Sequence, residues 1–291
     1  MSIRNKLRQF IIDYTTHCSE ADTKVMIGRS WVLFTKNVIS TSFEFRTYEP
    51  VICIIAQGEK EIIASGEVIS ASVGQSIIIS HDIHVQARIK VNKNDMPYAA
   101  IIIPIDIQKL RGIAVRMSFG VQVEYKQSAI NVGSTSSELE DAIMRYLKLI
   151  HRPEEIDVLA TNLLQEIYFR ALTSEGGKML RELLIADSHA DRIHRAVSYI
   201  KSNYRSDVSI DDLTNLVGMS TSSFHAHFKR ITKTTPKKMQ RDLRLMEVRD
   251  RLRVTRETVS TLAFDVGYNS VAHLSKEYKS KFGKSPLQDK I

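Results

Sequence analysis

The sequence predicts an α+β chain with a β-rich first half and an all-α last third. The first half holds at least six short apolar segments, separated by turn residues at regular spacing, which is typical of a β-sandwich or barrel. Residues 191–291 show helical periodicity instead, and one helical pattern occurs there twice. A length of 291 residues with 43% hydrophobic residues suits two domains, each with its own core.

Charge is distributed unevenly between these two parts. From Asp191 onward there are 20 Lys and Arg against 11 Asp and Glu, a net charge of +9. The preceding residues carry −1, which agrees with the total of +8. A basic excess confined to one domain is typical of a domain that meets nucleic-acid phosphates.

Few features indicate secretion or membrane insertion. Two cysteines, Cys18 and Cys53, make a disulfide scaffold implausible, and residues 1–20 carry polar groups throughout. The longest apolar runs, Val51–Ala56 and Ala99–Ile105, are far shorter than the ~20 residues of a membrane span. We expect a soluble, cytoplasmic, nucleoid-associated protein with no membrane partner.

The β-rich half is preceded by a short helix within residues 1–20. Ser65-Gly66 between two β-rich segments predicts a two-residue hairpin turn, and residues 92–95 predict a loop. The expected strands are Trp31–Phe34, Val51–Ala56, Glu59–Ala64, Glu67–Ser72, Ser76–Ser80, Val85–Val91 and Tyr98–Ile103.

Three helices are expected between the two parts. Ser136 starts the first with a capping signal, followed by one apolar stripe that includes Leu139 and Ile143. The second, Ile156–Leu172, is apolar on more than one side, so we expect it to pack on the β-rich half, to form a subunit interface, or both. Lys178–Ala186 forms the third. Residues 187–191 are polar and mark our domain boundary.

The first copy of the repeated pattern predicts a helix-turn-helix. Ser209 begins one helix, and Gly218 ends it, because only Gly adopts a left-handed conformation at low cost. The next helix buries Phe224 and Phe228 one turn apart. Its outer face then carries the residues expected to contact DNA. Those expected at or near base edges are Ser222, His225 and Ala226, and those expected at phosphates are Lys229 and Arg230.

The second copy repeats these positions. Leu262 matches Leu213 at an offset of 49, and Leu274 matches Phe224 at an offset of 50, so one residue is added after the turn. Its outer face offers Val271 or Ala272 to a thymine methyl and Lys276 to a guanine or a phosphate. The expected DNA-contacting residues here are Ser270, Val271, Ala272, Ser275, Lys276 and Lys279; Lys281 and Lys284 add further charge.

A longer helix, from Pro236 to about Arg253, separates the copies and acts as a spacer. The copies depart from each other at one position that matters for backbone geometry. Gly283 follows the second recognition helix, whereas Lys233 follows the first. A left-handed Lys costs about 1 kcal/mol. We therefore expect the first recognition helix to end differently or to be less fixed.

Several of these segments resemble a known family. Leu262-Ala-Phe-Asp-Val-Gly-Tyr268 and Phe282-Gly-Lys-Ser-Pro286 are close to the signature of the AraC/XylS family of bacterial transcriptional regulators. Tyr48–Lys60 and the later Val73-Gly-Gln75 resemble the cupin-like N-terminal domain of one branch of that family. The resemblance implies a cupin-like barrel for an effector or a dimer contact within 1–186, helical over about 136–186. It also implies a DNA-binding domain, 187–291, with units at about 209–231 and 258–282.

The barrel offers three residues as effector ligands. Cys53 lies in an apolar run, either as a small buried hydrophobe or as a cavity thiol that reacts with an electrophile. His81 and His84 are spaced His-x-x-His in an expected loop, as ordinary loop residues or as effector ligands. Metal cupins need a His-x-His pair and a nearby Glu, and no third histidine follows at suitable spacing. We expect no metal and no cofactor.

The sequence therefore predicts a DNA-binding transcriptional regulator that is not an enzyme. A helical bundle with a solvated charged face does not explain two matched Gly turns, and RNA-binding modules use exposed aromatics where these are inward. The alternative function is a cupin-type metal enzyme fused to a DNA-binding domain. The expected partner is double-stranded DNA at a promoter or operator. RNA polymerase, a small-molecule effector and a second copy of the chain are candidate partners.

Overall fold

The computed structural model describes residues 3–15, 22–37, 39–64, 66–91, 97–117 and 128–290. It divides into two compact units. The first comprises Met1–Asp191 with Ile231–Lys233, and the second comprises Arg192–Arg230 with Thr234–Ile291. Cys18 and the expected loop at residues 92–95 lie outside the described residues, as does Ser65.

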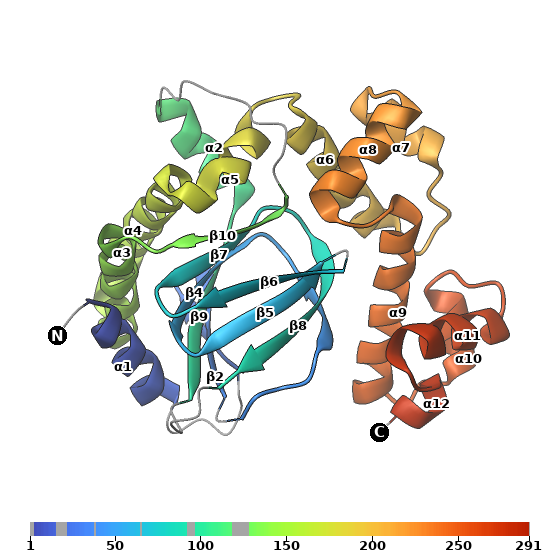
Figure 1. Ribbon diagram of the computed structural model, residues 1–291, viewed down its shortest axis with the longest axis horizontal. Coiled ribbons are helices and arrows are strands. Elements are labelled where there is room, and N and C mark those ends of the chain that lie inside the picture. Colours follow the sequence, from blue (N-terminus) through green and yellow to red (C-terminus); the bar gives the residue numbers. More distant parts are fainter. Residues whose placement is uncertain are drawn as a thin grey trace. The chain divides into compact units, whose positions relative to one another are not determined.

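The first unit is built on two antiparallel sheets (Figure 1). Within the described residues, the larger sheet has the order β1-β2-β9-β4-β7-β10 and the smaller one β3-β8-β5-β6. The strands are β1 (Asp22–Ile27), β2 (Ser30–Asn37), β3 (Glu44–Tyr48), β4 (Val51–Gln57), β5 (Glu59–Ala64), β6 (Glu67–Ser72), β7 (Gln75–Ile79), β8 (Ile83–Lys90), β9 (Tyr98–Pro104) and β10 (Ile130–Ser134). This is the β-rich N-terminal fold that the turn spacing predicts.

The hairpin of β5 and β6 has the expected register. Ala64 pairs with Glu67, so two residues separate the strands, and Gly66 takes a positive φ of 85°. A two-residue turn needs positive φ because its twist must match that of the flanking strands. The turn chemistry in the sequence thus correctly places this hairpin.

Helices cover one face of the larger sheet. They are α1 (Ile3–Thr15), α2 (Ile107–Arg116), α3 (Ser137–Lys148), α4 (Pro153–Thr173) and α5 (Lys178–Leu184), with short 3₁₀ turns at Leu149–His151 and Glu175–Gly177. Ser136 caps α3 as expected, by accepting a hydrogen bond from the Leu139 amide at 3.2 Å. The predicted N-terminal and middle helices are therefore all present.

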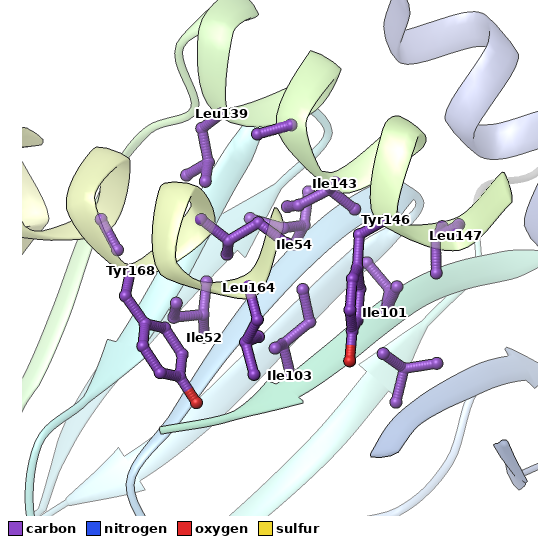
Figure 2. Close-up of a cluster of buried hydrophobic side chains, with 14 of the residues drawn as sticks. Ile52, Ile54, Ile101, Ile103, Leu139, Ile143, Tyr146, Leu147, Leu164 and Tyr168 are labelled. Carbon is purple, nitrogen blue, oxygen red and sulfur yellow. The ribbon is translucent and has the colours of Figure 1, made fainter. Parts of the chain in front are cut away.

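The core of the first unit lies between these helices and the sheet. Figure 2 shows Ile143 and Tyr146 of α3 and Leu164 of α4 pointing toward Ile54 of β4 and Ile101 of β9. All five side chains are at most 4% exposed. β4 is buried on both faces, which explains its continuous apolar run. Packing on the sheet, one of the two roles expected for α4, is therefore shown.

The second unit is helical throughout its described elements. These are α6 (His189–Asn203), α7 (Ile210–Val217), α8 (Thr221–Thr232), α9 (Pro236–Val254), α10 (Val259–Asp265), α11 (Val271–Phe282) and α12 (Pro286–Asp289). Figure 1 shows α9 running between the α7–α8 pair and the α10–α11 pair. Pro236 starts α9 because its missing N–H would be unsatisfied in the first turn anyway.

Candidate nucleic-acid interface and effector cavity

The first helix-turn-helix is formed by α7 and α8. Ser209 caps α7 by accepting a hydrogen bond from the Asp212 amide at 3.0 Å. Gly218 ends the helix with φ 63° and ψ 47°, in the left-handed region. Phe224 and Phe228 are fully buried, with ring centroids 5.5 Å apart. Their burial fixes the rotation of α8 and leaves the opposite face of the helix outward.

The residues expected to contact DNA in this copy lie on that outward face. The exposed ones are Ser222, His225, Ala226 and Lys229. Arg230 is half-buried, and its Nη2 lies 3.1 Å from His227 Nδ1. The structure thus brings four of the five together at the surface of one helix and holds the fifth beside a histidine.

The second helix-turn-helix is formed by α10 and α11. Thr258 caps α10 and Ser270 caps α11 through their hydroxyls, which accept hydrogen bonds from amides two or three residues into each helix. Leu274 and Tyr278 are fully buried. Tyr278 donates a hydrogen bond to Asp289 of α12 at 2.8 Å. These contacts orient α11 as the phenylalanines orient α8.

The expected contact residues of this copy divide by exposure. Those that are exposed are Ser270, Ala272, Lys276 and Lys279, whereas Val271 and Ser275 are half-buried. The Ser270 hydroxyl already accepts a hydrogen bond from the His273 amide at 3.4 Å. Lys276 and Ala272, four residues apart, are therefore the most accessible of the predicted base-reading side chains on α11.

Lys281 does not supply charge for DNA, contrary to our expectation. Its Nζ forms an ion pair with Asp242 Oδ1 at 2.9 Å, and its side chain is only 9% exposed. Burial lowers the pKa of the Lys281 ammonium, and the carboxylate opposes that shift. Helical periodicity could not predict this ion pair, because Asp242 lies 39 positions earlier in the sequence. This lysine fastens α11 to α9 instead.

Lys233 adopts the left-handed conformation after α8, with φ 60°. Gly283 takes φ 76° at the matching position after α11. The expectation that the two recognition helices end differently is therefore wrong. The first copy tolerates a conformation that costs a non-Gly residue about 1 kcal/mol.

Arg244 of α9 connects the second copy to the segment that follows α6, which the sequence did not reveal. Its guanidinium donates to the carbonyls of Tyr204, Gly267 and Ser206 at 2.6, 2.8 and 2.8 Å. Gly267 is the turn residue of the second copy, and a Cβ there would lie 1.9 Å from the Arg205 carbonyl oxygen. The second turn is therefore packed directly against the segment that follows α6.

A basic cleft lies beside this junction. It has a volume of about 650 Å³, and its lining includes Lys237, Lys238 and Arg241 from the first turns of α9 and His273 from α11. Lys237 and Lys238 are exposed. Cationic side chains at this position were not predicted as DNA contacts, although three basic residues within five positions were a visible signal.

The three candidate effector residues do not gather at one site. Cys53 is 2% exposed on β4; burial raises the pKa of its thiol, opposed by Lys60 and a hydrogen bond with Tyr98. His81 is fully buried, with its Nε2 3.0 Å from the carbonyl oxygen of Ala190. His84 lies in β8 rather than in the expected loop, with its Nδ1 2.9 Å from Thr47 Oγ1.

A cavity of about 480 Å³, here called the barrel cavity, lies in the first unit. Leu33 and Ile102 line it from the larger sheet, and Ala87 and Lys60 from the smaller one. None of the three candidate effector residues is among its lining. On β8 the lining residues are Ala87, Arg88 and Ile89, whereas His84 lies nearer the start of the strand.

Among the residues that the structure describes, no group of three His, Cys, Asp or Glu side chains is arranged to hold a metal ion. In the same part of the chain, every helix is too short or too polar to span a lipid bilayer.

A β-rich unit with a cavity, followed by a unit that exposes two recognition helices, defines the class of DNA-binding transcriptional regulators. Comparison with known families agrees. The family described as AraC-type transcriptional regulator N-terminus matches residues 32–179, and the helix-turn-helix domain family matches residues 213–290. The chain belongs to the AraC family of transcriptional regulators.

Two curated relatives are transcriptional regulators too, so the alternative of a cupin-type metal enzyme fused to a DNA-binding domain is not favoured. The raffinose operon regulatory protein RafR of Pediococcus pentosaceus is 29% identical over 141 residues, or 48% of this chain and 50% of that protein. The transcriptional activator RhaS of Escherichia fergusonii is 26% identical over 153 residues, or 51% of this chain and 54% of that protein. The chain thus spans about half the length of the curated relatives it matches.

The fold also has solved counterparts. A structure of ToxT from Vibrio cholerae matches with a TM-score of 0.56 and 14% identity, covering 88% of this chain and 97% of that chain. A second ToxT structure, of a variant in its apo form, matches with a TM-score of 0.55 and 10% identity over 88% and 96% of the two chains. At this identity the likeness shows a shared fold.

Proposed function

We propose that this chain is a sequence-specific regulator whose α8 and α11 enter successive major grooves on one face of an asymmetric DNA site. The side chains assigned to base edges are Ser222, His225, Ala226, Val271, Ala272 and Lys276. Those assigned to the sugar-phosphate backbone are Lys229, Arg230, Ser270, Ser275 and Lys279. Neutral His and Ser make weaker base contacts than Arg or Asn, so α8 reads more loosely than α11.

The observation that carries this proposal is the anchoring of the second copy through α9. Lys281 pairs with Asp242, and Arg244 binds the turn at Gly267. A rigid spacer lowers the entropy lost when a second recognition helix docks, because the first docking event already positions it. The outer faces of α8 and α11 are left exposed.

The basic cleft supplies a further backbone contact in this proposal. Lys237, Lys238 and Arg241 lie at the start of the spacer helix. A phosphate between two occupied major grooves would meet them there. Phosphate contacts of this kind fix the position of the protein on the DNA and make its affinity depend on salt, but they do not distinguish one base from another.

The barrel is proposed to hold a small-molecule effector in the barrel cavity. Its volume of about 480 Å³ falls within the range of ligand sites, and its lining combines apolar walls with a few charged groups. Effector binding would then change the affinity of the second unit for its operator. RNA polymerase and a second copy of the chain are candidate partners; α4 exposes Val158 and Leu159 beside its buried face.

Selection of bound sequences from random double-stranded DNA tests the DNA-reading proposal. We expect an enriched site of about two helical turns, since two recognition helices on one face of B-DNA lie ~34 Å apart. Lys276→Ala should weaken binding to that site and relax the base preference at one position, with Lys24→Ala on the first unit as the control. Unchanged affinity and base preference for Lys276→Ala would show that the assignment for α11 is wrong.

A further inference from the structure

The barrel cavity has apolar walls contributed by both sheets. Trp31, Leu33 and Ile102 line it from β2 and β9, and Ala87 and Ile89 line it from β8. A ligand in this position would bury its carbon skeleton between the two layers, where removing apolar surface from water stabilises the complex. The apolar part of the site thus favours an organic molecule over an inorganic ion.

Lys60 is the most deeply buried charge of this cavity. It lies on β5 and is 7% exposed, with its Nζ 4.8 Å from the centroid of the Tyr48 ring. Among the described residues, no carboxylate lies within 4 Å of this ammonium, although Asp22 and Glu49 also line the cavity. Lys60 is therefore a buried cation without an ion-pair partner in the described part of the chain.

The other cations of the cavity are already paired. Arg46 forms an ion pair with Glu44 at 2.9 Å, and Arg88 forms one with Glu61 at 2.5 Å. Their guanidinium charges are compensated by the protein itself. Lys60 differs from these two arginines because no carboxylate of the described residues pairs with it.

A buried ammonium loses its hydration, and among the described residues no carboxylate replaces that hydration at ion-pair distance. Burial on its own lowers the pKa of Lys60, but Tyr48, Cys53 and Asp22 act the other way and the net direction is upward. The ammonium therefore keeps its charge at neutral pH. A charged group that lies in a cavity lining without an ion-pair partner among the described residues is typical of a ligand site.

We propose that the barrel cavity binds a small organic anion, a carboxylate or a phosphate monoester, whose negative group pairs with Lys60. The carbon skeleton of the anion packs against Trp31 and Leu33. This inference rests on the proposed role of the barrel as an effector domain and names the chemical class of the effector. A neutral polyol of the same size would leave Lys60 uncompensated, so the site discriminates against it.

Trp31 makes the test direct, because it is the single tryptophan of the sequence and lines the cavity. Its fluorescence is titrated with benzoate, hexanoate and glucose 6-phosphate, and with benzamide, hexanamide and glucose as neutral counterparts. We expect a saturable change with at least one anion and none with its neutral counterpart. The carboxylate and phosphate arms distinguish the two kinds of anion. A response to the neutral compounds alone, or to no compound at millimolar concentration, would overturn the proposal.

Lys60→Met tests the anchor, with Lys90→Met as the matched control, since Lys90 pairs with Glu61 and does not line the cavity. We expect affinity for the responding anion to fall on the order of thirtyfold in Lys60→Met and to stay within about twofold in Lys90→Met. Equal affinities in the wild-type protein and Lys60→Met would exclude Lys60 as the anchor.

Thermal unfolding with and without the responding anion gives an independent readout. Saturating anion should raise the melting temperature of the wild-type protein and of Lys90→Met, because it binds the folded state, and should raise that of Lys60→Met much less. An equal rise in Lys60→Met and the wild-type protein would exclude Lys60 as the anchor. Operator binding by the wild-type protein is measured separately, so failure of the DNA-reading proposal is distinguishable from failure of this one.

Discussion

Lys281 Nζ of α11 lies 2.9 Å from Asp242 Oδ1 of α9, and the two side chains are 9% and 8% exposed. Removing one member of a buried pair leaves the other charge uncompensated, so Asp242→Ala should cost about 3–5 kcal/mol. The double variant Asp242→Leu/Lys281→Met should lie much closer to the wild-type protein. Denaturant unfolding followed by helical circular dichroism measures both. Equal losses in the single and double variants would show that the pair does not act as a unit.

Two glycines that both have a positive φ should respond very differently to substitution by alanine. Gly267 has φ 90°, and a Cβ there would lie 1.9 Å from the Arg205 carbonyl oxygen. Gly283 has φ 76° and open space around it. Gly283→Ala should cost about 1 kcal/mol, the strain of a left-handed residue, whereas Gly267→Ala adds a backbone clash and should cost several times more. Similar melting temperatures for the two variants would contradict the close approach at Gly267.

Arg244→Lys should loosen the second copy, because Arg244 holds the turn at Gly267. A lysine cannot reproduce the fork that binds the carbonyls of Tyr204, Ser206 and Gly267, and we expect a loss of about 2 kcal/mol in stability. Affinity for the full operator should fall, while affinity for DNA carrying only one half-site should change little. Arg256→Lys, at an exposed position after α9, is the control. Equal effects on full and half-sites would argue against a spacer role for α9.

Acid should destabilise the second unit through Glu247. Burial alone raises the pKa of this carboxyl, but hydrogen bonds from Tyr204 and Arg205 and the nearby Arg251 outweigh it, and the net shift is downward. A carboxyl with a lowered pKa in the folded state stabilises the protein above its unfolded pKa of ~4.3, and this contribution is lost as the pH falls further. Unfolding of Glu247→Gln should therefore depend less steeply on pH between about 5 and 3. The exposed Asp211→Asn variant should keep the wild-type slope.

Local signals in the sequence predicted most of the elements. Apolar runs bounded by turn residues placed β2 and β4 to β9, and the caps at Ser209, Thr258 and Gly218 placed both helix-turn-helix units. Strands β1, β3 and β10 were missed because their residues are half polar and lack a clear alternation. Helices α2 and α12 were missed too, the second because four residues are too few to show a period.

Relationships across long sequence separations were not predictable. Inward and outward faces of α8 and α11 followed from spacing alone, since Phe224 and Leu274 are both fully buried. The pairing of Lys281 with Asp242 and the contacts of Arg244 depend on how the helices pack, which periodicity does not encode. For the same reason Lys60 of the barrel cavity was overlooked, while Cys53 was selected by residue type.

Methylation-protection footprinting of the selected operator with dimethyl sulfate tests the central claim most directly. The account predicts two patches of protected major-groove guanines on one face of the DNA, about one helical turn apart, both bound by one molecule of the chain. Lys276→Ala should weaken the patch assigned to α11 and leave the other in place. A single protected patch per molecule, or two patches on opposite faces of the DNA, would contradict the proposal that both helix-turn-helix units read DNA together.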